Sequence, residues 1–275
     1  MTNVNRTLSL LALSSCLCAC AGPPPVRPLG AASCEAIAAQ PDPDGDGTAS
    51  TDVTDVTDGD VTDDPLARAL RDYDAGALAR LLDAPPDART AALAAHGLGE
   101  ILRLEASLAE GRQDDALLEA LTARRAEVAR RGLTAVAEAL AAAPGDVALL
   151  VARGELRAYL IDGLRTGLLY GRVARKELQA ALTRAPRDPD ARLAWAKQLY
   201  YLPGSAGGDL ARAAQELEAV VADAPDHEPT WGFLGQVYLA LGREDAARAA
   251  LTRALCLNPR SARGRAWLLR EEDQE

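Results

Sequence analysis

From Pro65 onward, apolar and polar residues follow each other at the spacing of an α-helix. Aliphatic side chains recur every three or four positions, most clearly in the segments Leu66–Leu82, Ala88–Leu108, Ala116–Ala142 and Val147–Ile161. This spacing places the apolar side chains on one face of a helix. The alternation with a period of two that indicates a strand is scarce. We therefore predict an all-α fold in which residues 65–143 form N-terminal helices.

The second half of the chain repeats a pattern of a small residue, a bulky apolar residue, a second small or β-branched residue and a proline. Three copies share one internal spacing and a weaker copy precedes them: Ala174-x3-Leu178-x2-Ala181-x4-Pro186, Ala213-x3-Leu217-x2-Val220-x4-Pro225, Ala247-x3-Leu251-x2-Ala254-x4-Pro259, and the weaker Gly132-x3-Val136-x2-Ala139-x4-Pro144. Their prolines are separated by 42, 39 and 34 residues. Small residues let two helices approach closely, and proline cannot continue a helix. The pattern therefore predicts a series of helix pairs.

The last copy also has a signature on its first helix, Trp231-x2-Leu234-Gly235-x2-Tyr238. Together the two patterns resemble the tetratricopeptide repeat, whose helix pairs stack into a curved α-solenoid. The resemblance covers about residues 146–270 and implies repeats at about 144–186, 187–225 and 226–259, with a capping helix ending near 271. The last of the N-terminal helices would be a degenerate repeat. Two proline intervals exceed 34 residues, so we expect insertions between paired helices, at Pro203–Gly208 and Gly163–Gly167.

The resemblance also implies a binding face. In this family the concave surface is formed mainly by the first helices of the repeats and by the capping helix. Aligning the repeats on their prolines places these residues there: Glu155, Tyr159, Lys197, Tyr200, Tyr201, Phe233, Gln236 and Arg270. Aromatic and long polar side chains together are typical of binding surfaces. Alternatively, Tyr159 and Tyr200 fill gaps made by the insertions. Trp231 and Leu251 are expected in the core.

The first 20 residues have the features of an export signal. Arg6 precedes a short apolar run, and small residues precede Cys16. The run is too short to span a bilayer as a mature helix. Leu13-Ser14-Ser15-Cys16 resembles the bacterial lipobox, which implies lipidation of Cys16, with Cys20 as a second candidate. The alternative is a plain secretory signal with incidental cysteines.

Residues 21–64 are predicted to form a disordered acidic tether. Residues 28–64 contain ten acidic residues and no Lys or Arg, and low hydrophobicity with one sign of charge opposes folding. The rest of the chain is nearly neutral, which disfavours nucleic acid as a partner. Asp42, Asp44 and Asp46 match the start of an EF-hand loop, but Val53 stands where the twelfth-position Glu would be. A solvated linker is therefore favoured over a calcium site.

The folded part contains no motif that predicts catalysis. His96 and His227 are far apart in sequence, and phosphate-loop, zinc and serine-elbow patterns are missing. We predict a protein that is not an enzyme and needs no cofactor or metal. The repeats and the lipobox-like start together resemble tetratricopeptide lipoproteins of bacterial envelopes. This implies an adaptor for envelope proteins, held by a lipid anchor, most simply on the periplasmic face of the outer membrane.

A second function stays open at this point. The chain could be an accessory lipoprotein of a periplasmic solute transporter that binds a small apolar ligand. A groove open to solvent would favour the protein-binding scaffold, whereas a closed apolar pore would favour the ligand carrier.

Overall fold

The computed structural model describes residues 64–272, which form helices joined by turns, with no strand in this part of the chain. The predicted all-α fold is confirmed. The signal and tether predicted for residues 1–63, including Cys16 and Cys20, lie outside the described residues. In chain order the helices are α2 (Pro65–Arg71), α3 (Ala75–Asp83), α4 (Ala88–Gly111), α5 (Asp115–Ala142), α6 (Val147–Tyr159), α7 (Leu164–Arg184), α8 (Pro189–Tyr201), the 3-10 turn η1 (Gly204–Ala206), α9 (Leu210–Asp223), α10 (Glu228–Ala240), α11 (Glu244–Leu257) and α12 (Ala262–Glu272).

Helix starts are marked by aspartate side chains that accept hydrogen bonds from the first free backbone N–H groups. They are Asp64, Asp74, Asp87, Asp114, Asp146, Asp188 and Asp209. Each N-cap of this kind is worth about 1 kcal/mol, because it satisfies a donor that the helix itself cannot. These helix boundaries are therefore specified locally, before any tertiary packing.

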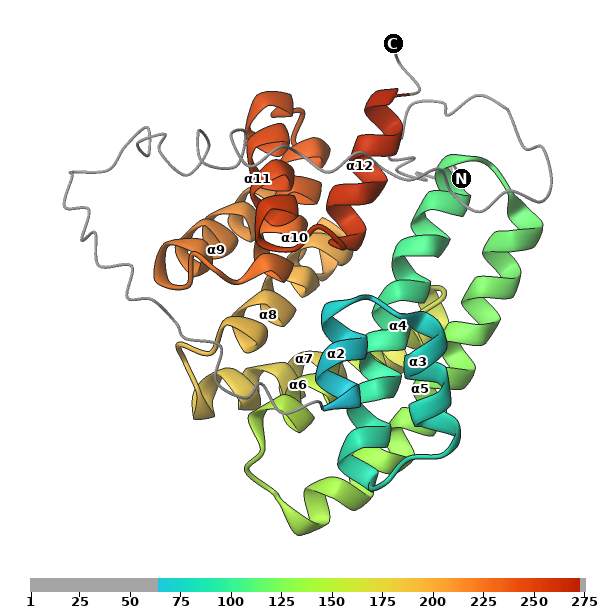
Figure 1. Ribbon diagram of the computed structural model, residues 1–275. Coiled ribbons are helices and arrows are strands. Elements are labelled where there is room, and N and C mark those ends of the chain that lie inside the picture. Colours follow the sequence, from blue (N-terminus) through green and yellow to red (C-terminus); the bar gives the residue numbers. More distant parts are fainter. Residues whose placement is uncertain (1–63, 273–275) are drawn as a thin grey trace, which may run out of the picture.

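Consecutive helices pack as antiparallel pairs. The long pair α4 and α5 lies on one side of the molecule, and α8 to α11 lie on the other (Figure 1). The terminal helix α12 lies between the α10–α11 pair and α4 (Figure 1). The chain thus curves back so that its last helix faces one of its first helices.

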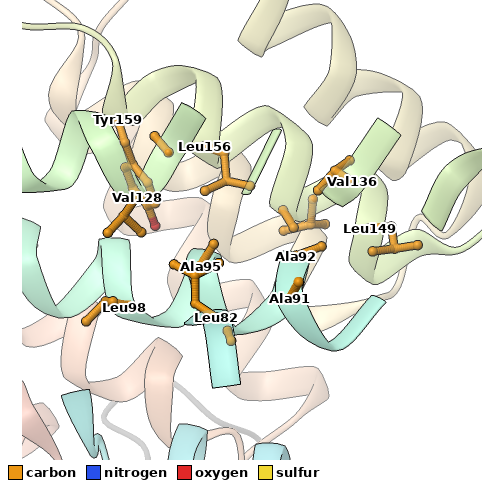
Figure 2. Close-up of a cluster of buried hydrophobic side chains, with 14 of the residues drawn as sticks. Leu82, Ala91, Ala92, Ala95, Leu98, Val128, Val136, Leu149, Leu156 and Tyr159 are labelled. Atoms are coloured by element: carbon orange, nitrogen blue, oxygen red, sulfur yellow. The ribbon is translucent and has the colours of Figure 1, made fainter. Parts of the chain in front are cut away.

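Small residues at the helix contacts explain the close packing. Gly154 of α6 faces Leu178 of α7, and Gly235 of α10 faces Leu251 of α11, so that an added Cβ would collide with the leucine in each case. Leu251 is fully buried, as expected, whereas Trp231 is half-buried at the edge of the core. Figure 2 shows the larger apolar cluster, in which side chains from α3, α4, α5 and α6 interdigitate.

The two expected insertions differ in their outcome. Pro203–Gly208 lies between α8 and α9, as predicted, and contains η1. The expectation that Gly163–Gly167 is a break is wrong, because α7 begins at Leu164. The Thr166 hydroxyl accepts hydrogen bonds from the Asp162 and Gly163 amides, both at 3.0 Å, and so caps the helix one turn early. The extra residues therefore lengthen α7 instead of forming a loop. No described helix is both long and apolar enough to cross a membrane.

Candidate functional site

The predicted binding face is brought together by the first helices of three pairs. Glu155 and Tyr159 come from α6, Lys197, Tyr200 and Tyr201 from α8, and Phe233 and Gln236 from α10. They are neighbours: Lys197 Nζ lies 3.2 Å from Glu155 Oε2, and the Tyr200 and Phe233 ring centroids are 5.3 Å apart. Gln236 Nε2 donates to the Tyr200 hydroxyl at 3.4 Å. Arg270 lies on α12, but its side chain is outside the described part.

Residues that the repeat pattern did not identify complete this face. Helix α4 contributes His96, Glu100 and Arg103, and α12 contributes Arg263. Together with Glu155, Tyr159 and Lys197 they form what we call the inner polar cluster, defined as His96, Glu100, Arg103, Glu155, Tyr159, Lys197 and Arg263. A sequence signal for it existed, because Glu100 and Arg103 interrupt the apolar run of α4.

Lys197 holds the centre of the inner polar cluster. Its Nζ lies 3.3 Å from Glu100 Oε1 and 3.2 Å from Glu155 Oε2, and only 5% of Lys197 is exposed. Each carboxylate has further partners. Glu155 pairs with His96 Nε2 at 2.7 Å, and Glu100 accepts from the Tyr159 hydroxyl at 3.0 Å. One lysine therefore neutralises two carboxylates that come from different helices.

Burial and charge act in opposite directions on the two carboxylates. Burial alone would raise the pKa of Glu155, but attraction to Lys197 and the hydrogen bond with His96 hold that pKa at about 2. Burial would likewise raise the pKa of Glu100, and the charges of Lys197, Arg103 and Arg263 hold it well below its usual range. Both groups are therefore ionised at neutral pH.

The inner polar cluster carries an excess of positive charge. Three cations, Arg103, Lys197 and Arg263, face two carboxylates, Glu100 and Glu155, when His96 is neutral. Arg125 of α5 adds to this, since burial and repulsion by Arg103 lower its pKa. Within the described residues, the buried Nε of Arg103 has no hydrogen-bond partner. The site therefore retains capacity for one more acceptor.

Tyr201 connects the inner polar cluster to solvent. The Arg103 guanidinium carbon lies 4.5 Å from the Tyr159 ring centroid and 4.4 Å from that of Tyr201. Tyr159 is buried, whereas Tyr201 is 40% exposed. We call the part of this site that is reachable from solvent, Tyr201 with the adjoining Arg103 and Arg125, the rim.

The rest of the face is covered by the chain itself. The Tyr73 hydroxyl, between α2 and α3, donates to Glu228 of α10 at 2.8 Å. Asn258 Nδ2 donates to the Arg71 carbonyl at 2.8 Å, and Arg260 pairs with Asp72. These contacts join the first helices to the last repeat through polar groups. No sequence pattern indicated this cover, because the paired residues are far apart in the chain.

The described residues include no group of three or more histidine, cysteine or acidic side chains arranged to hold a metal. His227, the second histidine, is bonded in a turn: its ring nitrogens lie 2.7 Å from Thr230 Oγ1 and 3.2 Å from Asp190 Oδ1. It lies outside the inner polar cluster and serves the start of α10.

Comparison with known proteins supports the repeat assignment for the end of the chain. The family model described as Tetratricopeptide repeat matches residues 206–269, from the end of η1 into α12. This is a scaffold family that is typically non-enzymatic. No curated protein gave a significant match.

Two solved structures are similar over most of their length. One is TTC0263, a thermophilic TPR protein of Thermus thermophilus, with 19% identity, a TM-score of 0.47, and 75% of this chain and 96% of that chain covered. The other is YrrB, a TPR protein with an unusual peptide-binding site, with 18% identity, a TM-score of 0.35, and coverage of 74% and 96%. The family match and the paired helices together identify this chain as an all-α tetratricopeptide-repeat protein.

Proposed function

We propose that the protein is a scaffold that binds a polypeptide partner at the rim of its inner polar cluster. The observation that carries this proposal is Arg103, a buried cation with an unpartnered Nε that stacks on the exposed ring of Tyr201. Arginine and tyrosine are enriched among the residues that dominate protein interfaces. An acidic side chain of the partner could supply the acceptor that Arg103 lacks.

Stability alone is a poor explanation for this arrangement. Desolvating several charges is expensive, and replacing a buried ion network with packed apolar residues often stabilises a protein. Here the network lies on the inner register of the repeat helices, where Glu155, Lys197 and Phe233 belong to successive pairs. A binding role for this face gives a reason for charged residues at positions where aliphatic ones would pack well.

The same observation weighs against the small apolar ligand. The inner positions that the structure describes carry carboxylates, guanidinium groups and hydroxyls, as in Glu100, Arg263 and Tyr159. An apolar ligand would leave these groups desolvated without new hydrogen bonds. The protein-binding scaffold is therefore the better supported of the two functions.

We further propose that the protein is exported and anchored by a lipidated cysteine at the periplasmic face of the bacterial outer membrane, next to envelope partners. Support comes from the sequence of residues 1–20, with Cys16 preceded by a lipobox-like triplet and Cys20 as the alternative. Labelling a bacterial host with a radioactive fatty acid tests this. Incorporation should be lost in Cys16→Ala, loss in Cys20→Ala alone would move the anchor, and no incorporation at all would exclude it.

The rim is tested with a photo-crosslinking amino acid. Placed at Tyr201, it should give discrete protein adducts in an envelope extract, and Arg125→Gln in the same chain should weaken them. Tyr238 is a matched control: it is a half-buried tyrosine whose hydroxyl donates to Glu218 at 2.9 Å, away from the rim. Equal adducts from positions 201 and 238 would refute the rim as the partner site.

A further inference from the structure

Helix α7 is longer than its counterparts. It has 21 residues, whereas α9 and α11, the second helices of the next two pairs, have 14 each. Its partner α6 runs antiparallel to it, and Gly154 of α6 faces Ala174 and Leu178 of α7. Because α6 ends at Tyr159, it does not reach the first turns of α7. Those turns extend beyond the helix pair.

The outer side of these turns exposes large apolar side chains. Leu168 is 71% exposed, Leu169 is 66% exposed and Val173 is 39% exposed. The inner side of the same turns is occupied, because Ile161 lies against Gly167 and Gly171, and Tyr170 packs on the larger apolar cluster. Leaving two neighbouring leucines in water is unfavourable, so an apolar contact on the outer side would stabilise this helix.

Basic residues lie on the same outer side. Arg165, Arg172 and Lys176 are positioned on it, and at 100° per residue they share with the three apolar residues one face about 140° wide. We call this face, Arg165, Leu168, Leu169, Arg172, Val173 and Lys176, the α7 outer face. Among the described residues, none of its three cations makes an ion pair, and the face itself contains no acidic residue.

The carboxylates on or next to α7 are already engaged elsewhere. Asp162, before the helix, accepts from the Thr166 hydroxyl at 2.8 Å. Glu177 lies on the flank and is held by Arg153 at 3.1 Å and Arg157 at 2.8 Å. The positive charge of the α7 outer face is therefore not neutralised from within its own helix.

We propose that the α7 outer face docks on an anionic phospholipid surface. Exposed leucines interleaved with arginine and lysine are the composition of helices that lie in the membrane interface, with the apolar groups inserted and the cations at the headgroups. The face is a convex strip on one helix with no adjoining groove. A fluid bilayer adapts to such a strip, whereas a folded protein partner needs a complementary concavity. This inference does not depend on the lipid anchor or on the rim.

Vesicle binding of the full chain tests the proposal. Every sample carries Cys16→Ala and Cys20→Ala, so that acylation contributes to none of them. Vesicles with about 30% phosphatidylglycerol should bind the chain more tightly than pure phosphatidylcholine vesicles. Arg165→Gln/Arg172→Gln/Lys176→Gln should weaken binding to the anionic vesicles about a hundredfold. Leu168→Ser/Leu169→Ser should weaken it at least about tenfold.

A charge-matched control separates this face from net charge. Arg112, Arg124 and Arg130 are also basic but lie outside α7, and Arg112→Gln/Arg124→Gln/Arg130→Gln should bind as the parent chain does. Hydrogen exchange gives a local measure: anionic vesicles should slow exchange of the amides in the first three turns of α7. Equal loss in the control variant, or unchanged exchange in α7, would overturn the proposal.

Other occupants give different results. If the α7 outer face instead binds an acidic polypeptide, this chain's own acidic segment included, poly-glutamate should bind with the same dependence on Arg165, Arg172 and Lys176. The anionic vesicles should then show no dependence on those residues. That outcome would refute docking on lipid.

Discussion

Replacing Lys197 with methionine removes the charge at the centre of the inner polar cluster and keeps the length of the side chain. Glu100 and Glu155 would then remain buried with one fewer cation between them. Breaking a buried ion pair by removing one partner costs about 3–5 kcal/mol, because it leaves an uncompensated charge. We expect a loss of this size in the free energy of unfolding. An exposed lysine at this position would cost little, so this expectation follows from the burial of Lys197.

The loss should depend on pH with a definite sign. In the native chain the pKa of Glu155 is about 2, below its unfolded value of about 4.3. A depressed pKa stabilises the fold above the unfolded value, and that contribution is lost as pH falls from about 4.3 towards 2. In Lys197→Met the pKa of Glu155 rises, so this variant loses less on acidification. The difference between the two chains should therefore be largest at neutral pH and shrink at low pH.

Urea unfolding at about pH 7 and about pH 3.5 measures both effects. Lys176→Met is the matched control, since Lys176 lies on the α7 outer face and should change stability by no more than about 0.5 kcal/mol. Glu155→Gln added to Lys197→Met should restore part of the loss, because it removes one of the two orphaned charges. A loss below about 1 kcal/mol at neutral pH, or one that does not change on acidification, would refute the electrostatic account of the inner polar cluster.

Three further predictions concern stability and are also measured by urea unfolding. Leu251→Ala should cost about 2–5 kcal/mol, because Leu251 is fully buried against Gly235 and leaves a cavity; a cost below about 1 kcal/mol would contradict this packing. Asp209→Ala should cost about 1 kcal/mol through loss of the cap on the Arg212 amide, and Asp209→Asn should cost clearly less. Gly208→Ala should cost about 1–3 kcal/mol, because the new Cβ would collide with the Leu202 carbonyl. Gly204→Ala, which meets nothing within 4 Å, is its control, and equal effects of the two would show that the turn between α8 and α9 relaxes freely.

Repeat spacing was enough to predict which residues share the inner face. Glu155, Lys197 and Phe233 occupy equivalent positions in successive pairs, and stacked pairs bring equivalent positions together. The spacing said nothing about Glu100 and Arg103, because α4 belongs to the N-terminal helices and lies outside the clear repeats. Nor did it show that Arg263 reaches Glu100, a contact between residues 163 positions apart. Such contacts depend on how far the whole stack curves, which is set by many packing angles at once.

The length of α7 was mispredicted for a local reason. Glycines at 163 and 167 indicate a break when they are read by themselves. The Thr166 hydroxyl and the Asp162 carboxylate supply the hydrogen bonds that start a helix there, and the exposed Leu168 and Leu169 follow from that early start. The α7 outer face therefore exists because capping overcame the helix-breaking tendency of glycine.

Helix α8 couples the two halves of the described chain. Its Ala191 and Ala194 belong to the larger apolar cluster with α3 to α7, whereas Leu193 and Leu199 belong to the smaller one with α9 to α11. Lys197, on the same helix, makes the ion pairs to α4 and α6. Packing on both sides makes the position of α8 sensitive to each half. A partner that contacts Tyr201, at the end of α8, would act on the one helix whose displacement disturbs both apolar clusters and the inner polar cluster together.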